Sequence, residues 1–205
     1  RYHTSEFIES NCLKSWESYT QSDSYKNSST ESDFEYNKEI NEKISHYHGN
    51  IINLEIDAVV KAANTGLLGG AGIDGAIHSG AGELLRQECY HLHGAETGEA
   101  KITRGYDLPA KYVIHTVGPT SVDNEALESC YKNCLELVSK HGIKTVAFCG
   151  ISTGIYGFPP EKASLIALRI IREWLENEEN RAKVDNIILT TFLPNEERIY
   201  LQNIP

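Results

Sequence analysis

The sequence predicts an α/β domain in which helices cover both faces of a β-sheet. The segments 57–63, 144–149 and 187–192 are short and mostly apolar, as expected for strands that are buried on both faces. Segments with apolar residues at helical spacing separate these strands along the chain. Because a sheet and an amphipathic helix must each bury an apolar face, their alternation predicts a layered fold.

The predicted elements follow one another along most of the chain. Strands are expected at 43–48, 57–63, 100–104, 112–117, 144–149 and 187–192. Apolar residues recur at helical spacing over 73–89, 124–141 and 160–174, which predicts three helical segments. Asp123 or Asn124 suits the N-cap of the second segment, and Pro160 suits the first turn of the third.

Two regions of different composition divide the chain. Residues 1–37 are expected to form a polar, serine-rich N-terminal extension, and residues 38–205 the folded domain. Leu13 and Trp16 indicate one short helix in the extension that is anchored on the domain, and the run 22–33 is typical of a flexible linker. Because the sequence begins at Arg1 and contains no Met, we expect it to be cut from a longer product.

Charge and cysteine content exclude several classes of function. The formal net charge of −10 disfavours direct binding to a nucleic-acid backbone, which proteins normally neutralise with cationic side chains. No apolar run is long enough to cross a membrane. The five cysteines contain no CxxC pair, which suits reduced thiols and an intracellular location, in the cytoplasm, the nucleus or the mitochondrion.

Two glycine-containing loops, at 64–72 and 150–159, each follow a predicted strand and precede a predicted helix. Such junctions offer backbone N–H groups and the positive end of a helix dipole to an anion. Two of them in one domain predict a ligand with two linked phosphates. The GAGIDG segment at 70–75 matches GxGxxG, but no strand ending on an acid follows at the required distance. A hydride-transfer enzyme is therefore disfavoured.

Five motifs occur in order along the chain: VKAAN at 60–64, LLGGAGIDGAIH at 67–78, TGEAKIT at 97–103, YVIHTVGP at 112–119 and ISTGIYGFP at 151–159. Together they resemble the macrodomain family, and specifically the MacroD-type ADP-ribosyl hydrolases. The resemblance covers about residues 38–203. It does not require the N-terminal extension.

The resemblance implies a three-layer α/β/α sandwich with a mixed, mostly parallel sheet, and a site for ADP-ribose. It also implies hydrolysis of the ester between mono-ADP-ribose and acidic side chains of proteins, together with deacetylation of O-acetyl-ADP-ribose. No metal and no other cofactor is implied, nor a nucleic acid or membrane as a partner. The protein is expected to be a monomer.

The resemblance also assigns roles to residues. Asn64, Asp74 and His78 are the expected catalytic residues: Asn64 binds the distal ribose, while Asp74 orients that ribose and the attacking water. The α-phosphate of the ligand can serve as the base. The expected ligand-binding residues are Asn50, Ile51, Ala63, Gly70, Ala71, Gly72, Ile73, Ser152, Thr153, Gly154, Ile155, Tyr156 and Phe192, the last stacking on adenine.

Three positions depart from the family pattern. Asn50 stands where an Asp is usual, and the loss of charge is expected to weaken adenine binding by about 1 kcal/mol. Lys61 replaces the first Asn of VNAAN, and its ammonium either finds a partner in the interior or reaches the ligand cleft. Ala71 replaces a glycine, which requires a negative φ.

Other interpretations of the same residues stay open. Taken singly, Asp74 is an ordinary acid of a first helical turn, His78 a structural histidine and Phe192 a core residue. The pairs His46/His48 and His91/His93 have no Cys or carboxylate at ligand spacing, so we expect no metal there. Rival functions are a reader module that binds ADP-ribose without turnover and a nucleotide- or nucleic-acid-binding scaffold, which the acidic charge disfavours.

Overall fold

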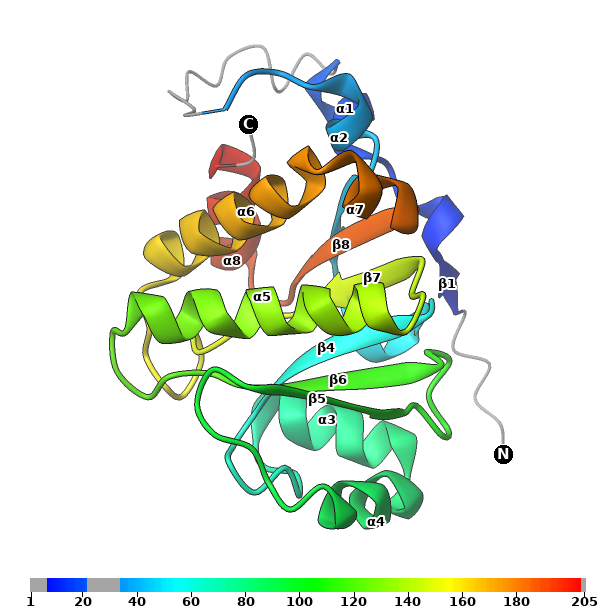
Figure 1. Ribbon diagram of the computed structural model, residues 1–205, viewed down its shortest axis with the longest axis vertical. Coiled ribbons are helices and arrows are strands. Elements are labelled where there is room, and N and C mark those ends of the chain that lie inside the picture. Colours follow the sequence, from blue (N-terminus) through cyan, green and yellow to red (C-terminus); the bar gives the residue numbers. More distant parts are fainter. Residues whose placement is uncertain (1–6, 22–33, 204–205) are drawn as a thin grey trace.

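The computed structural model describes residues 7–21 and 34–203 and contains a six-stranded sheet (Figure 1). The strand order is β2-β8-β7-β4-β6-β5, and all neighbouring strands are parallel except β5 and β6. In sheet order the strands are β2 (Ile44–His48), β8 (Asn186–Thr191), β7 (Thr145–Phe148), β4 (Ala58–Ala63), β6 (Tyr112–Val117) and β5 (Ala100–Arg104). The predicted mixed, mostly parallel sheet is confirmed.

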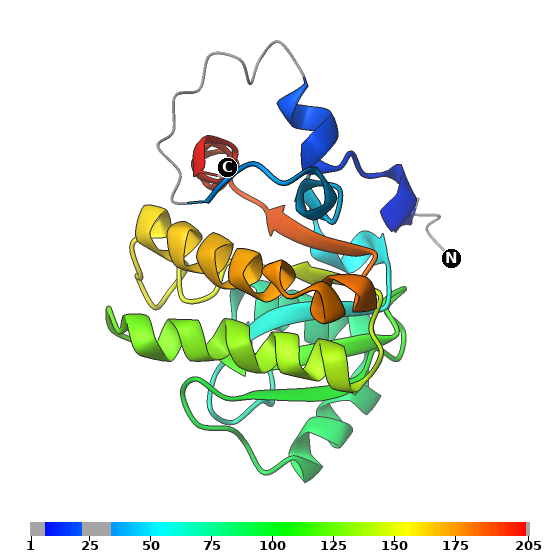
Figure 2. The same cartoon turned by 45° about the horizontal axis from the view of Figure 1, so that its top comes forward.

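Helices cover both faces of this sheet, which confirms the three-layer α/β/α prediction. On one face lie α5 (Asn124–Lys140) and α6 (Pro160–Glu176), which run side by side in both views (Figures 1 and 2). On the other face lie α3 (Gly72–Ala81) and α4 (Glu83–His91). The remaining helices are α1 (Trp16–Thr20), α2 (Lys38–Asn41), α7 (Glu178–Lys183) and α8 (Pro194–Asn203).

The central strand β4 distributes its side chains between the two layers. Ala58 and Val60 lie in the core under α5 and α6, whereas Val59 and Ala63 lie in the core under α3 and α4. Successive side chains of a strand point to opposite faces, so Lys61 belongs to the layer of Val59 and Ala63. Its side chain is fully buried there. Of the two alternatives for the ammonium of Lys61, the interior and the ligand cleft, the structure therefore adopts the interior.

The prediction of one helical segment over 73–89 is wrong in one respect. The segment is two helices, because α3 ends at Gly82, whose φ of +81° cannot continue a right-handed helix. The apolar stripe runs through both helices, so periodicity alone did not reveal the break. The short helices α7 and α8 were also missed, since their apolar residues are too few to mark a helical face.

The described part of the N-terminal extension packs on the domain. Strand β1 (Ile8–Glu9) pairs in parallel with β3 (Leu54–Glu55), outside the main sheet. Helix α1 begins at Trp16, whose side chain is 1% exposed and belongs to the core beside Ile40 and Ile44. The expected linker at 22–33 lies outside the described residues, and the division at residue 37 stays a prediction.

Within residues 7–21 and 34–203, no helix is long and apolar enough to cross a membrane.

Replacing Trp16 by Ala is expected to lower the free energy of unfolding by about 3–5 kcal/mol, because a large core side chain is lost. Denaturant unfolding measures the change. Phe7→Ala is the matched control, since Phe7 is an exposed aromatic residue of the same segment. Its effect should stay within about 0.5 kcal/mol. An equally small effect of Trp16→Ala would mean that the extension is dispensable for stability.

Candidate functional site

A cleft of about 440 Å³ lies where the parallel strands end. Strands β2, β4, β7 and β8 run in the same direction, so their carboxyl ends meet at one edge of the sheet. The residues that follow each of these strands form the cleft. Its lining includes Asn64, Asp74 and every predicted ligand-binding residue: Asn50, Ile51, Ala63, Gly70, Ala71, Gly72, Ile73, Ser152, Thr153, Gly154, Ile155, Tyr156 and Phe192.

His78 is the one predicted site residue that does not line this cleft. It lies one turn after Asp74 in α3. Sequence reasoning missed eight lining residues: Gly49, Ala62, Cys149, Gly150, Thr190, Thr191, Leu193 and Glu196. Most of them end or directly follow a parallel strand, and that position was the signal that could have found them.

The loop after β4 forms the floor of the cleft and is held by Asn64. The Asn64 side chain accepts a hydrogen bond from the Gly66 N–H (3.1 Å) and donates one to the Gly69 carbonyl (3.1 Å). The backbone carbonyl of Asn64 accepts from the Leu67 N–H, also at 3.1 Å. These contacts turn the chain sharply out of the strand. A ligand that hydrogen-bonds to the Asn64 side chain must either share these two hydrogen bonds or replace them.

The first turn of α3 faces the cleft without a side-chain cap. Ala71 occupies the N-cap, and its φ is −93°. This is the negative φ that an alanine in place of a glycine requires. The N–H groups of an uncapped first turn remain available to an anion. The loop approaches the helix closely: a Cβ on Gly75 would lie 2.4 Å from the Gly70 carbonyl oxygen, so only glycine fits there.

The loop after β7 forms the opposite wall. Ser152 holds a φ of +64°, and its buried hydroxyl has no hydrogen-bond partner among the described residues. The Phe158 N–H donates to the Ser152 carbonyl (2.9 Å) and the Gly157 N–H to that of Gly154 (3.0 Å), which fixes the loop. Ile155 projects from it with 82% of its surface exposed. A strained serine in a well-tied loop indicates a shaped binding surface.

The cleft lining contains no Lys or Arg among the described residues, and two acids, Asp74 and Glu196. An anionic ligand must therefore be bound by backbone N–H groups and by the end of α3 rather than by cationic side chains. This agrees with the expectation from the two glycine loops. Phosphate binding through amides also suits a protein with a net charge of −10.

Asp74 connects the cleft to a buried cation. Lys61 Nζ donates to Asp74 Oδ1, and the two side chains are 0% and 7% exposed. The other oxygen faces the cleft floor: a methyl group placed on Gly70 would lie 3.1 Å from Asp74 Oδ2 and 3.3 Å from Asn64 Nδ2. Lys61 itself does not line the cleft. The carboxylate therefore turns one oxygen to the interior and presents the other beside the Asn64 amide.

Two histidines lie behind this pair. His78 Nε2 is 3.6 Å from Asp74 Oδ1, and neither it nor His115 Nδ1 has a hydrogen-bond partner in the described part of the chain. Burial first and the Lys61 ammonium second lower the pKa of His78. The same causes hold the pKa of the buried His115 well below its ordinary value. At neutral pH both rings are uncharged.

One group of side chains resembles a metal site that sequence spacing could not reveal. Donor atoms of His78, Cys89 and His115 lie within 4.8 Å of one another, although the residues are far apart in the chain. Burial raises the pKa of the Cys89 thiol to about 11, and a metal needs the thiolate. The ammonium of Lys61 also acts on all three residues. This chemistry disfavours a dication.

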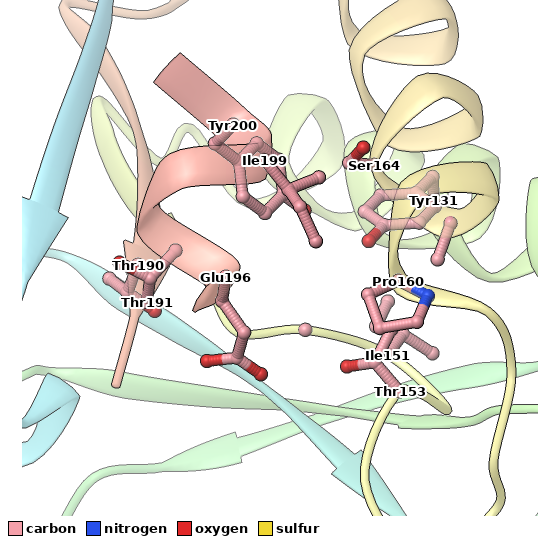
Figure 3. A pocket seen from close by; sticks show the side chains of 12 residues that line it. Tyr131, Ile151, Thr153, Pro160, Ser164, Thr190, Thr191, Glu196, Ile199 and Tyr200 are labelled. Carbon is pink, nitrogen blue, oxygen red and sulfur yellow. The ribbon is translucent and has the colours of Figure 1, made fainter. Parts of the chain in front are cut away.

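The far end of the cleft is built from β8, α8 and the turn after β2. Glu196 Oε2 accepts hydrogen bonds from the N–H groups of Phe192 (3.1 Å) and Leu193 (3.0 Å), and so shapes the turn into α8. Figure 3 shows Glu196 between Thr191 of β8 and Thr153 of the opposite loop, beside a narrow side pocket. Phe192 is 70% exposed, so it is not a core residue.

Asn50 begins the short 3₁₀ turn Ile51–Asn53 at this end of the cleft. Its side-chain oxygen accepts a hydrogen bond from the Ile52 N–H at 3.3 Å. The acceptor that was expected for the adenine amino group is thus already engaged with the backbone. An oxygen has two lone pairs, so a second hydrogen bond to a ligand remains open.

Comparisons with known proteins agree with this arrangement. A family model described as Macro domain matches residues 60–167. The chain is 50% identical to mouse ADP-ribose glycohydrolase MACROD1 over 84% of its own length and 54% of that protein. It is 48% identical to human ADP-ribose glycohydrolase MACROD2 over 95% of its length and 47% of that protein. The chain thus spans about half the length of these relatives.

A solved structure is also similar over almost the whole chain. The macrodomain of Trypanosoma brucei, crystallised in complex with ADP-ribose, superposes with a TM-score of 0.84 at 36% identity. The match covers 97% of this chain and 77% of the other.

The buried His115 makes the stability of the protein depend on pH. Unfolded chains bind a proton near the ordinary pKa of 6.5, whereas the folded state resists it. The free energy of unfolding should therefore fall below pH 6.5 by about 1.4 kcal/mol per pH unit from this group. Denaturant unfolding at several pH values measures the slope. His115→Asn should reduce it and the exposed His91→Gln should not; equal slopes in all three proteins would contradict this assignment.

Proposed function

Because this chain belongs to the macrodomain family, we propose that it binds ADP-ribose and hydrolyses the bond between mono-ADP-ribose and acidic side chains of proteins. The single observation that carries the proposal is that Asp74 Oδ2 and the Asn64 amide both face Gly70 at the floor of a cleft walled by two amide-rich loops. The names of the MACROD1 and MACROD2 relatives, both ADP-ribose glycohydrolases, support it.

Each part of the ligand has a matching surface. The diphosphate would lie between the first turn of α3 and the loop 150–159, where amides replace cationic side chains. Adenine would stack on the exposed ring of Phe192, near Asn50. The distal ribose would lie over Asn64 and Asp74. The cleft therefore offers a surface for every part of the ligand, from an aromatic side chain at one end to a carboxylate at the other.

The proposed mechanism uses positioning rather than a strong protein base. Asp74 Oδ2 would accept a hydrogen bond from the attacking water or from the ribose, while the Asn64 amide donates to a ribose oxygen. Because Lys61 already holds Oδ1, the Asp74 carboxylate is fixed in one orientation, and we assign it the role of an orienting group. The water oxygen would bond to the ribose carbon that carries the ester, and the bond from that carbon to the ester oxygen would break. The carboxylate of the protein substrate would leave, and the proton of the water would pass to the α-phosphate of the ligand.

Further parts of the proposal concern substrates and setting. O-acetyl-ADP-ribose carries the same kind of ester on the same ribose, so the site would also deacetylate it. We propose a monomer, because the cleft is formed by one chain. An intracellular location agrees with the five cysteines, all free and four of them buried.

A release assay tests the reaction. A protein labelled with mono-ADP-ribose on glutamate should lose its label with the wild type, and Asp74→Ala should slow release by about 100-fold or more. Glu125→Ala is the matched control, because Glu125 is an exposed first-turn acid of another helix, α5. Calorimetry of ADP-ribose binding tests the alternative function. If the wild type binds ADP-ribose tightly but does not release the label, the protein is a reader module.

The adenine end has its own test. Phe192→Ala should weaken ADP-ribose binding by about 1 kcal/mol, or several-fold, because the stacking surface is lost. Leu165→Ala, an exposed apolar residue on α6, is the control and should leave the dissociation constant unchanged. Calorimetry measures both. If Phe192→Ala binds ADP-ribose as the wild type does, adenine lies elsewhere.

A further inference from the structure

Lys61 and His78 both approach the same oxygen of Asp74. Lys61 Nζ donates to Asp74 Oδ1, and His78 Nε2 lies 3.6 Å from that same atom. Lys61 reaches it from β4, whereas His78 reaches it from the next turn of α3. The second oxygen, Oδ2, faces Gly70 and Asn64 on the cleft side. Lys61 Nζ hydrogen-bonds to the inner oxygen, whereas His78 Nε2, at 3.6 Å, does not, so in this chain the partner of Oδ1 is Lys61.

The consequence for His78 is visible in its contacts. Its side chain is 11% exposed, and its Nε2 atom has no hydrogen-bond partner among the described residues. The charged and titratable groups that face it are Lys61 from β4, Asp74 from α3, Arg86 and Cys89 from α4, and His115 from β6. Burial, Lys61 and Arg86 lower its pKa, and Asp74 alone among these charges raises it.

We propose that Lys61 is a positioning residue that holds the inner oxygen of Asp74 in place of His78, and so leaves the Nε2 atom of His78 without a hydrogen-bond partner behind the site. The inference rests on the proposed function only in its kinetic part. Lys61 does not line the cleft, so it acts on the reaction through Asp74. It fixes the carboxylate rotamer and directs Oδ2 to the ligand.

The family pattern has Asn where this chain has Lys61, so Lys61→Asn is the variant that tests the proposal. Asparagine at position 61 is uncharged and shorter than lysine, so it cannot supply the buried counter-charge of Asp74. A buried carboxylate without a partner is costly, and His78 is the nearest group that can take a proton and replace the lost cation. In Lys61→Asn, His78 should therefore become charged and pair with Asp74 Oδ1.

A spectroscopic titration tests this without reference to catalysis. The imidazole nitrogen signals of His78, followed by NMR against pH, should titrate about 1 pH unit or more higher in Lys61→Asn than in the wild type, because one cation leaves and Asp74 is unopposed. Lys162→Asn, an exposed lysine on α6, is the matched control and should not move the midpoint. An unchanged midpoint in Lys61→Asn would overturn the proposal.

A double-mutant cycle tests the kinetic part. Wild type, Lys61→Asn, His78→Gln and the double variant are compared by label release and by ADP-ribose affinity. The release rate should fall about tenfold more on His78→Gln in the Lys61→Asn background than in the wild type, because only there does His78 hold Asp74. Equal losses in both backgrounds would overturn the proposal.

The two measurements separate this proposal from the proposed function. If no protein of the set releases the label, the reaction is wrong, and the His78 titration alone decides whether Lys61 displaces His78. Thermal unfolding of all four proteins shows whether a low rate reflects loss of folding. Since Lys61→Asn keeps a polar group at this position and His78 is expected to supply the charge, the variant should remain folded.

Discussion

The ion pair of Lys61 and Asp74 joins the central strand β4 to the first turn of α3, where the cleft begins. Both charges are almost completely removed from water, so each depends on the other, and the loss of one would leave an uncompensated charge inside the protein. The pair therefore holds α3 against the sheet in one register. It also sets the direction of the carboxylate, because one oxygen is occupied and only the other can meet a ligand.

The electrostatics of the cleft follow from the acidic character of the whole protein. Two carboxylates line the cleft and no described Lys or Arg does, yet the ligand proposed for it carries two phosphates. Oriented N–H groups solve this problem, because they attract phosphate without adding side chains that would compete for Asp74. The ammonium of Lys61 is turned inward, where it pairs with the carboxylate of Asp74 and does not line the cleft.

The pattern of apolar residues predicted the fold well wherever an element is determined by contacts within its own short segment. Strand β4 and helix α5 were found because their apolar residues repeat at the strand or helix period, and the cap at Asp123 is a short-range contact. The break at Gly82 was missed because its positive φ does not alter the apolar stripe. The lining residues Thr190 and Glu196 were missed because they reach the cleft only through sheet order and the turn into α8.

The sequence by itself determined the layered architecture, the two glycine loops and the family, since each is written in short runs of residues. It also supplied most residues of the cleft as predictions, and the geometry brings these together at one edge of the sheet. Only the tertiary structure decided that the side chain of Lys61 points into the interior, that it forms an ion pair with Asp74 and that Nε2 of His78 has no hydrogen-bond partner among the described residues. These depend on which face of β4 is covered by α3 and α4, and such long-range packing has no local signature.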